Sequence, residues 1–332
     1  MSAPSPSMFS EPAQTLLKAG GLKQGRANLE VFADTALQVA KAAPRVLAVT
    51  SDSRGSGKLK PYGDALPRQI VEMGIAEQNL VGVAAGLAST GRTVFAVSPA
   101  CFLTARSLEQ IKNDVCYSDN PVVLVGISAG VSYGALGTTH HSLHDFAVLR
   151  AINNITVVAP GDNLEAQAAV RAAAAAPHPV YLRFGKAKLF DLPGPIDDFS
   201  FGKARTLREG GDLAILATGE TAIHAWLAAE NLATQGIEAT VLSIPTVKPL
   251  DSEAVLKAAR TTGKLITVEE HMVHGGLGDA CASLVVQSGV PCSMRIMGIP
   301  DEYTVTGSQS DIFRHYGISM EGISAKALKL LK

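Results

Sequence analysis

The sequence predicts an α/β protein made of two doubly wound domains, and three observations support this fold class. The chain has 332 residues, 47% hydrophobic and 18% charged, which suffices for about two cores of roughly 150 residues each. Short β-branched runs alternate with longer segments of helical spacing. The stretch 185–211, rich in glycine, proline and charge, interrupts that alternation. We therefore expect domains at 25–188 and 211–332, a linker at 189–210, and a loose Ser/Pro-rich lead at 1–24.

The first domain is predicted to alternate strands and helices along its whole length. Strands are expected at 45–50, 93–97, 122–127, 155–159 and 180–184, and helices at 28–43, within 69–90, and at 103–117, 143–151 and 163–176. The loop 51–68 follows the first strand. Open α/β sheets bind ligands at the carboxyl ends of their strands, so this loop is a candidate ligand loop as well as a candidate solvated loop.

The second domain is predicted to continue the same alternation. Strands are expected at 213–217, 239–243, 265–269 and 293–297, and helices at 222–235, 252–261 and 276–288. The two domains share this architecture without an internal sequence repeat.

Charge and cysteine content argue against several classes of function. The formal net charge is -1 and the pI is near 6.7, without a block of like charges, which disfavours nucleic acid or an anionic membrane as the main partner. The four cysteines form no CxxC pair, so neither a zinc site nor a disulfide framework is expected. Because the first residues lack a basic start and an apolar core, and no run of roughly 18 apolar residues occurs, we expect a cytoplasmic chain with no secretion signal and no membrane span.

Glu77 lies near the start of an apolar and small-residue segment that suits a helix buried on most sides. Two interpretations of its carboxylate remain open from the residues alone. It could complement the positive end of the helix dipole, which contributes roughly 0.3–1 kcal/mol. Alternatively it is desolvated, has a raised pKa, and shares a proton with a ligand nitrogen or acts in acid–base chemistry.

The segment GTTHHSLHD places His140, His141, His144 and Asp145 within six residues. In a helix, His140 and His144 would share a face. A metal site is one interpretation, although the segment has no HExxH or related spacing. An ordinary polar turn is the other.

Four motifs in one order carry a resemblance to a known family. The segment GIAEQNLVGVAAGLA (74–88) resembles the pyrimidine-binding domain of thiamine-diphosphate enzymes of the transketolase group, which includes transketolase and deoxyxylulose-phosphate synthase. The likeness continues through CFLTARSLEQIKNDV (101–115), GTTHHSLHDFAVLRAINNITVVAPGDNLEA (137–166) and VYLRFGK (180–186). The resemblance implies a pyrimidine-binding fold followed by a transketolase-like C-terminal domain.

The resemblance also implies roles for individual residues around the cofactor. Glu77 would bind N1′ of the cofactor's pyrimidine ring, and Phe102 would stack on that ring. His140 would handle protons near the reactive carbon and contact the substrate. Asp52 would contact the cofactor. On its residue type alone, Phe102 is equally compatible with a core position.

Arg106 and Arg183 fall at positions that resemble the phosphate-binding arginines of the family. Arginine suits this task because its planar fork donates two hydrogen bonds to phosphate. A surface salt bridge would explain either one alone. Ser128 is a further expected substrate contact, because it stands where relatives commonly have a histidine.

Two departures from the family pattern bear on the substrate. One is Ser128, and the other is Ala135 and Leu136, where relatives have an acidic pair. These positions help to bind sugar hydroxyls and phosphate in transketolases. The departures therefore imply a ketose other than the ordinary pentose phosphates, whether branched, modified or unphosphorylated.

A missing motif implies a partner chain. Full-length transketolases begin with a diphosphate-binding domain that has a GDG motif, and this chain has no GDG. The resemblance therefore implies the second half of a split transketolase. Thiamine diphosphate would bind only with an N-terminal partner subunit, which would hold the Mg²⁺ or Ca²⁺, in an α2β2 assembly. No metal ligand is expected from this chain itself.

The implied activity is the transfer of a two-carbon ketol (glycolaldehyde) unit from a ketose or ketose phosphate to an aldose. Two alternatives remain open. An E1β-type subunit of a 2-oxo acid dehydrogenase would use the same glutamate in an oxidative decarboxylation, although the arginines and the EQIKNDV segment fit transketolase better. A non-catalytic partner protein would retain the fold, although the set of Glu77, Phe102 and His140 argues against it.

Overall fold

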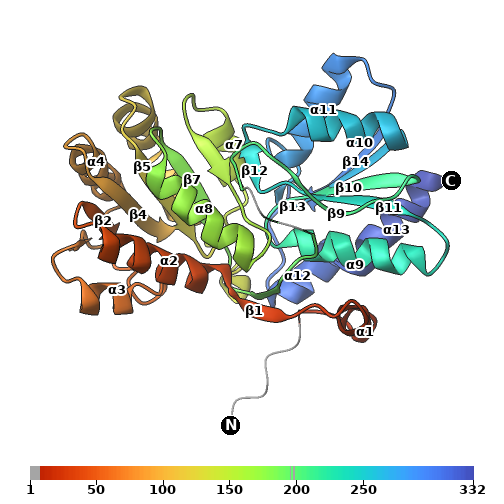
Figure 1. Cartoon of the computed structure of the whole chain (residues 1–332), viewed down its shortest axis with the longest axis horizontal. Coiled ribbons are helices and arrows are strands. Elements are labelled where there is room, and N and C mark those ends of the chain that lie inside the picture. Colours follow the sequence, from red (N-terminus) through yellow and green to blue (C-terminus); the bar gives the residue numbers. More distant parts are fainter. Residues whose placement is uncertain (1–7, 195, 197–198) are drawn as a thin grey trace, which may run out of the picture.

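Two β-sheets, each packed between helices, form the framework of the chain in the computed structural model, which describes residues 8–194, 196 and 199–332 (Figure 1). A seven-stranded sheet has the order β12-β6-β7-β5-β4-β2-β3, and a five-stranded sheet has the order β14-β13-β10-β11-β9. The edge pairs β12 with β6 and β9 with β11 are antiparallel, and the other pairs in these two sheets are parallel. The expected α/β class is therefore confirmed.

The seven-stranded sheet is buried on both faces. Strands β2, β4, β5 and β7 have almost no exposed residue, because helices cover both sides, which explains their continuous apolar sequence. One face packs on α2 and α8 around Phe32 and Phe184, and the other packs on α4 and α5 around Leu80 and Leu103. The strands are β2 (Val46–Thr50), β3 (Ile70–Glu72), β4 (Thr93–Pro99), β5 (Val122–Ile127), β6 (Thr156–Val158), β7 (Val180–Phe184) and β12 (Thr246–Lys248). The helices are α2 (Asn28–Ala42), α3 (Lys60–Ala65), α4 (Glu77–Ala88), α5 (Ala100–Arg106), α6 (Leu108–Gln110), α7 (Asp145–Arg150) and α8 (Asn163–Ala175).

The five-stranded sheet forms the second layered unit. In Figure 1, α10 and α11 lie above this sheet, and α9, α12 and α13 lie below it. The strands are β9 (Arg205–Arg208), β10 (Leu213–Ala217), β11 (Ala239–Ser243), β13 (Lys264–Met272) and β14 (Ser293–Ile299). The helices are α9 (Thr221–Ala233), α10 (Ser252–Thr262), α11 (Leu277–Ser288), α12 (Gln309–Tyr316) and α13 (Met320–Leu331). Within the described residues, no helix combines the length and apolar character that crossing a membrane requires.

The N-terminal lead differs from the loose segment expected at 1–24. Residues 1–7 lie outside the described part, but α1 (Glu11–Ala19) is a helix capped by Ser10, whose Oγ accepts a hydrogen bond from the Ala13 amide at 3.3 Å. Ala13 and Leu17 are buried, and α1 contacts α9 of the second unit. Packing against a distant helix stabilises this short helix, which the Ser/Pro-rich composition did not reveal.

Three further expectations need correction. The expected linker 189–210 contributes β9 and most of β8 (Lys188–Phe190), which pairs with β1 (Gln24–Ala27). The single helix expected at 103–117 is divided into α5, α6 and a π-helical turn (Ile111–Tyr117), with Ser107 at the first break. Strand β12, expected in neither domain, returns from the second half of the chain to pair with β6. The two sheets are thus joined by the backbone more than once.

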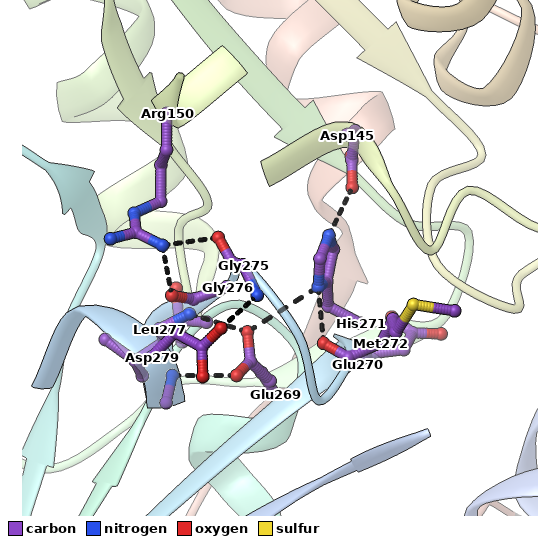
Figure 2. Close-up of polar contacts among 12 residues, drawn as sticks. Asp145, Arg150, Glu269, Glu270, His271, Met272, Gly275, Gly276, Leu277 and Asp279 are labelled. Atoms are coloured by element: carbon purple, nitrogen blue, oxygen red, sulfur yellow. Dashed lines mark hydrogen bonds and ion pairs between the residues drawn. The ribbon is translucent and has the colours of Figure 1, made fainter. Parts of the chain in front are cut away.

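Buried polar groups fill the junction between the two sheets (Figure 2). Arg150, at the end of α7, donates hydrogen bonds to the carbonyl oxygens of Gly275 and Gly276, the latter at 2.8 Å. His271 of β13 places its Nε2 atom 3.8 Å from Oδ1 of Asp145. Burial lowers the pKa of His271 to about 4, although the charge of Asp145 opposes this effect. The imidazole is therefore neutral at neutral pH.

Candidate active site

Several expected site residues lie along the edge of the seven-stranded sheet where its parallel strands end. Phe102 lies in α5 just after β4, Ser128 follows β5 directly, and Asp52 follows β2. Neighbouring strands end level with one another, since Pro99 pairs with Ile127. Ligands of open α/β sheets bind at this edge. The alternation of strands and helices is what brings these separate segments together.

Glu77 is the first residue of α4, and only 4% of its side chain is exposed. The residues that follow explain this burial, because Leu80, Val81 and Ala84 have no exposed surface and anchor the helix on the sheet. The start of a helix also stabilises a negative charge through the helix dipole. The position of Glu77 is thus compatible with both sequence-based interpretations, a dipole-complementing group and a buried functional carboxylate.

Arg106 links Glu77 to Phe102. Phe102 and Arg106 are four residues apart in α5 and therefore share a face of that helix. The Nη1 group of Arg106 donates to both carboxylate oxygens of Glu77, each at 3.0 Å. Its guanidinium carbon lies 4.2 Å from the centre of the Phe102 ring, within the range of a cation–π contact.

His140 extends this group from the loop between β5 and α7. Its ring meets those of Phe102 and Tyr133 edge to face, each with 5.3 Å between ring centres. Nδ1 of His140 lies 3.0 Å from the Thr139 hydroxyl. When that hydroxyl donates, the proton of a neutral imidazole lies on Nε2. Glu77, Phe102, Arg106 and His140 are called the Glu77 cluster below.

Tyr133 and Lys186 lie beside the cluster and were missed by the sequence analysis. Lys186 follows β7 closely and places its ammonium 4.8 Å from the centre of the Tyr133 ring. Burial raises the pKa of Tyr133, so its hydroxyl stays protonated at neutral pH. Applying the strand-end rule to every predicted strand would have indicated Lys186. Tyr133 lies further along its loop, and only the path of that loop brings it to His140.

Two other histidines of the GTTHHSLHD segment have structural partners. Buried His141 places Nδ1 2.6 Å from the Thr304 hydroxyl and Nε2 3.0 Å from the Gly134 carbonyl oxygen. His144 places Nε2 3.2 Å from the Thr104 hydroxyl. Within the described residues, no three His, Cys, Asp or Glu side chains are grouped to hold a metal ion. The geometry favours the polar-turn interpretation of this segment.

Asp52 and Ser128 lie at the same edge, apart from the Glu77 cluster. Asp52 is exposed, and its backbone amide donates to Oε1 of Glu72 at 2.6 Å. Ser128 is fully buried. Both have a φ of 52°, a left-handed conformation that is uncommon outside glycine. The described contacts place both residues in tight turns at the strand ends without joining them to the cluster.

Arg183 occupies a different position from the one expected of a phosphate-binding arginine. It is buried, and its Nε donates to Oδ2 of Asp145 at 2.8 Å. Its Nη2 donates to the carbonyl oxygens of Ser142 and Glu270, at 3.1 and 2.8 Å. Its guanidinium also lies 4.6 Å from the ring centre of Phe146. Arg183 is thus engaged at the junction between the sheets, in place of the expected contact with a substrate phosphate.

Two buried glutamates, Glu220 and Glu270, share one amide group at this junction. Nε2 of Gln309 donates to Oε2 of Glu220 at 2.7 Å and to Oε1 of Glu270 at 2.9 Å. Burial, followed by the charge of Glu270, raises the pKa of Glu220 to about 8. Burial raises the pKa of Glu270 to about 7, although Arg183 opposes this effect. The pair therefore retains a proton at neutral pH.

The Glu77 cluster fits the aminopyrimidine half of thiamine diphosphate. An aminopyrimidine ring requires a carboxylate beside a ring nitrogen and a flat apolar surface, and Glu77 and Phe102 offer both from adjacent helices. The described residues provide no matching acidic group for the metal that accompanies a diphosphate. The fit therefore covers one half of the cofactor.

Comparisons with known proteins agree with this geometry. The family described as "Transketolase, pyrimidine binding domain" matches residues 24–190, and "Transketolase, C-terminal domain" matches residues 202–323. One of the two subunits of an apulose-4-phosphate transketolase from Phocaeicola vulgatus is 49% identical over 303 residues, which cover 91% of this chain and 96% of that protein. The 6-deoxy-6-sulfo-D-fructose transketolase subunit SqwH of Clostridium sp. is 36% identical over 89% of this chain and 91% of that protein.

A solved structure extends the likeness to three dimensions. The structure, described as a split gene transketolase in an inactive beta4 tetramer, has a TM-score of 0.84 and 32% sequence identity, and the match covers 92% of this chain and 99% of that chain. Both family domains, the relatives and the fold agree over nearly the whole sequence. The chain therefore belongs to the transketolase family, and it consists of the pyrimidine-binding and C-terminal domains.

Proposed function

We propose that this chain is the pyrimidine-binding subunit of a split transketolase that depends on thiamine diphosphate. The enzyme would transfer a two-carbon glycolaldehyde unit from an anionic ketose to an aldose. The observation that carries this proposal is the nearly buried carboxylate of Glu77, at the start of α4 and next to Phe102 at the ligand-binding edge of the sheet.

Each residue of the cluster has a role that follows from its position. Glu77 shares a proton or a hydrogen bond with N1′ of the aminopyrimidine, and its burial keeps water from competing. Phe102 packs against the ring. Thiamine diphosphate, when bound, supplies the electron sink for cleavage of the C–C bond. His140, in contact with the edge of Phe102, moves a proton to or from a substrate hydroxyl. Asp52 contacts the cofactor from the end of β2.

The substrate we propose is a ketose with a terminal anionic group. The names of two relatives specify apulose 4-phosphate and 6-deoxy-6-sulfo-D-fructose, which carry a phosphate and a sulfo group. Arg106 and Lys186 are the cations beside His140 that suit such a group. Ser128 and Leu136 replace polar groups that bind ordinary pentose phosphates in the family. Because the apulose-4-phosphate relative shares about half its residues with this chain, apulose 4-phosphate is the first donor to test.

The partner we propose is an N-terminal transketolase subunit that holds the diphosphate and its Mg²⁺ or Ca²⁺, in a cytoplasmic α2β2 assembly. Relatives are named as separate subunits, which supports a split enzyme. Ile75 and Leu136 are large exposed apolar residues, and they lie close in sequence to Glu77 and His140. Such residues suit a surface that a partner covers. Light scattering on the co-expressed chains should give the mass of two copies of each.

Calorimetry tests the proposal as a whole. Thiamine diphosphate with Mg²⁺ is titrated into this chain alone and into this chain co-expressed with a transketolase subunit that carries the GDG motif. We expect tight binding only by the co-expressed pair, together with ketol transfer from apulose 4-phosphate. Absence of binding in both samples would reject a thiamine-diphosphate enzyme.

Glu77→Gln tests the central residue. The amide cannot share its proton as a carboxylate does, so turnover of the assembled enzyme should fall by about 100-fold or more. The matched control is Glu109→Gln, an exposed glutamate in α6, which should keep wild-type turnover. Near-normal turnover of the Glu77 variant, in a protein with wild-type melting behaviour, would sink the assignment.

A further inference from the structure

The guanidinium of Arg106 contacts two groups that the proposed function assigns to the cofactor. Its Nη1 donates to both oxygens of Glu77 at 3.0 Å, and its central carbon lies 4.2 Å from the centre of the Phe102 ring. The side chain of Arg106 is 48% exposed, whereas that of Glu77 is 4% exposed. A half-exposed surface side chain thus satisfies a nearly buried carboxylate.

An aminopyrimidine ring would make the same two contacts. A guanidinium and an aminopyrimidine are both flat and delocalised, and both present N–H donors in their own plane. Either group would direct an in-plane N–H at the carboxylate and lay its face on the aromatic ring. Because Glu77 and Phe102 offer one carboxylate and one ring, the two groups compete for the same place.

We propose that Arg106 is an internal stand-in for the aminopyrimidine, holding Glu77 and Phe102 until the cofactor displaces it. This inference rests on the proposed function, because it takes those two residues as the pyrimidine site. Without the guanidinium, Glu77 would be a nearly buried carboxylate with no cationic partner, which is unfavourable. The contact keeps the site folded and satisfied in a chain that has not yet met its partner or cofactor.

The position of Arg106 makes its displacement easy. It is the last residue of α5, just before the break at Ser107. Ion pairs with a half-exposed partner are weak, because water solvates the cation as soon as it leaves. After leaving Glu77, the cation still lies at the carboxyl end of a helix, where the dipole favours it. It is then free to bind the anionic group of the substrate.

The first test uses the full chain without its partner. The probe is the pyrimidine half of thiamine, 4-amino-5-hydroxymethyl-2-methylpyrimidine, and binding is followed by ligand-observed NMR. Arg106→Ala should bind the probe about 10-fold more tightly than the wild type, equivalent to about 1.4 kcal/mol. Arg106→Lys, which keeps the charge but lacks the flat group, should bind with intermediate affinity. Equal or weaker binding by Arg106→Ala would overturn the stand-in.

Further variants separate this inference from the proposed function. Adding Glu77→Gln to Arg106→Ala should remove the gain in affinity. If Arg106→Ala gains nothing but binding of the probe still depends on Glu77, the pyrimidine site stands and the stand-in falls. If binding does not depend on Glu77, the pyrimidine site itself is wrong. Arg92→Ala, at another exposed arginine, is the matched control and should bind as the wild type does.

The second test uses the assembled enzyme with its partner subunit. Arg106→Ala should tighten thiamine diphosphate by a similar factor in calorimetry, even where turnover falls because a substrate contact is lost. A variant that binds the cofactor more weakly than the wild type would show that Arg106 supports the cofactor directly and would overturn the proposal.

Discussion

Two arginines of this chain make nearly the same pair of contacts and differ in burial. Arg106 pairs with Glu77 and lies 4.2 Å from a phenylalanine ring, and Arg183 pairs with Asp145 and lies 4.6 Å from another. The side chain of Arg106 is 48% exposed, and that of Arg183 is 5% exposed. Water can replace the partners of the first arginine but has no access to those of the second. The same combination therefore serves as a removable cover at the sheet edge and as a permanent link at the junction.

The largest expected effect comes from breaking the buried member of this comparison. Arg183→Met would leave the fully buried Asp145 without its cation, so the free energy of unfolding should fall by about 3–5 kcal/mol. Arg106→Met should lower it by at most about 1 kcal/mol, since that pair is half exposed. Urea denaturation of both variants measures the two losses, and equal losses would refute the comparison.

A second prediction concerns the proton that the junction retains. The folded-state pKa of Glu220 is about 8, above its ordinary value of 4.5, so the native state binds more protons than the unfolded state between these values. Stability should therefore fall as pH rises from about 5 to 8, with a slope of up to about 1.4 kcal/mol per pH unit for one proton. Glu220→Gln keeps an oxygen for Gln309 and cannot ionise, so it should flatten this dependence.

The pH dependence of the melting temperature, measured between pH 5 and 8, checks this second prediction. Glu238→Gln, at a half-exposed glutamate of the second sheet unit, is the matched control and should leave the slope unchanged. A slope that survives in Glu220→Gln would show that the junction does not hold the proton there. The Glu77 cluster, at the exposed edge, should contribute no comparable slope.

The smallest expected effect separates the junction from the core of the second unit. The buried ring of His224 stacks on Phe9 with 5.0 Å between ring centres and meets Phe313 edge to face at 5.3 Å. Burial lowers its pKa from 6.5 to about 4, with the charge of Glu321 opposing. The unfolded state then binds more protons between these values, so stability should fall as pH drops from about 6.5 to 4.

His224→Leu should reduce this loss at acidic pH and change stability at pH 7 by less than about 1.5 kcal/mol, because the replacement is apolar and similar in volume. Melting temperatures at pH 7 and pH 5 provide the comparison. Together with Glu220→Gln, the variant should show two buried sites with opposite responses to pH. An unchanged acid response in His224→Leu would assign that response to other groups.

Much of the candidate site followed from local patterns. The apolar run after Glu77 predicted a buried helix with a carboxylate at its start, and the structure has α4 begin at that residue. Phe102 and Ser128 were placed at strand ends by the alternation of strands and helices. These features depend on hydrophobic spacing and on neighbours in sequence, so a single chain contains the information.

Contacts between distant segments decided the rest. The sequence alone determined the α/β class, the two sheets and the edge at which the Glu77 cluster gathers, because these depend on short-range periodicity. Only the tertiary structure decided that Arg183 is buried against Asp145, that Arg106 covers Glu77, and that α1 and β12 cross between the two units. The physical reason is that burial of a charged side chain depends on what packs over it, and here the covering residues come from segments far away in the sequence.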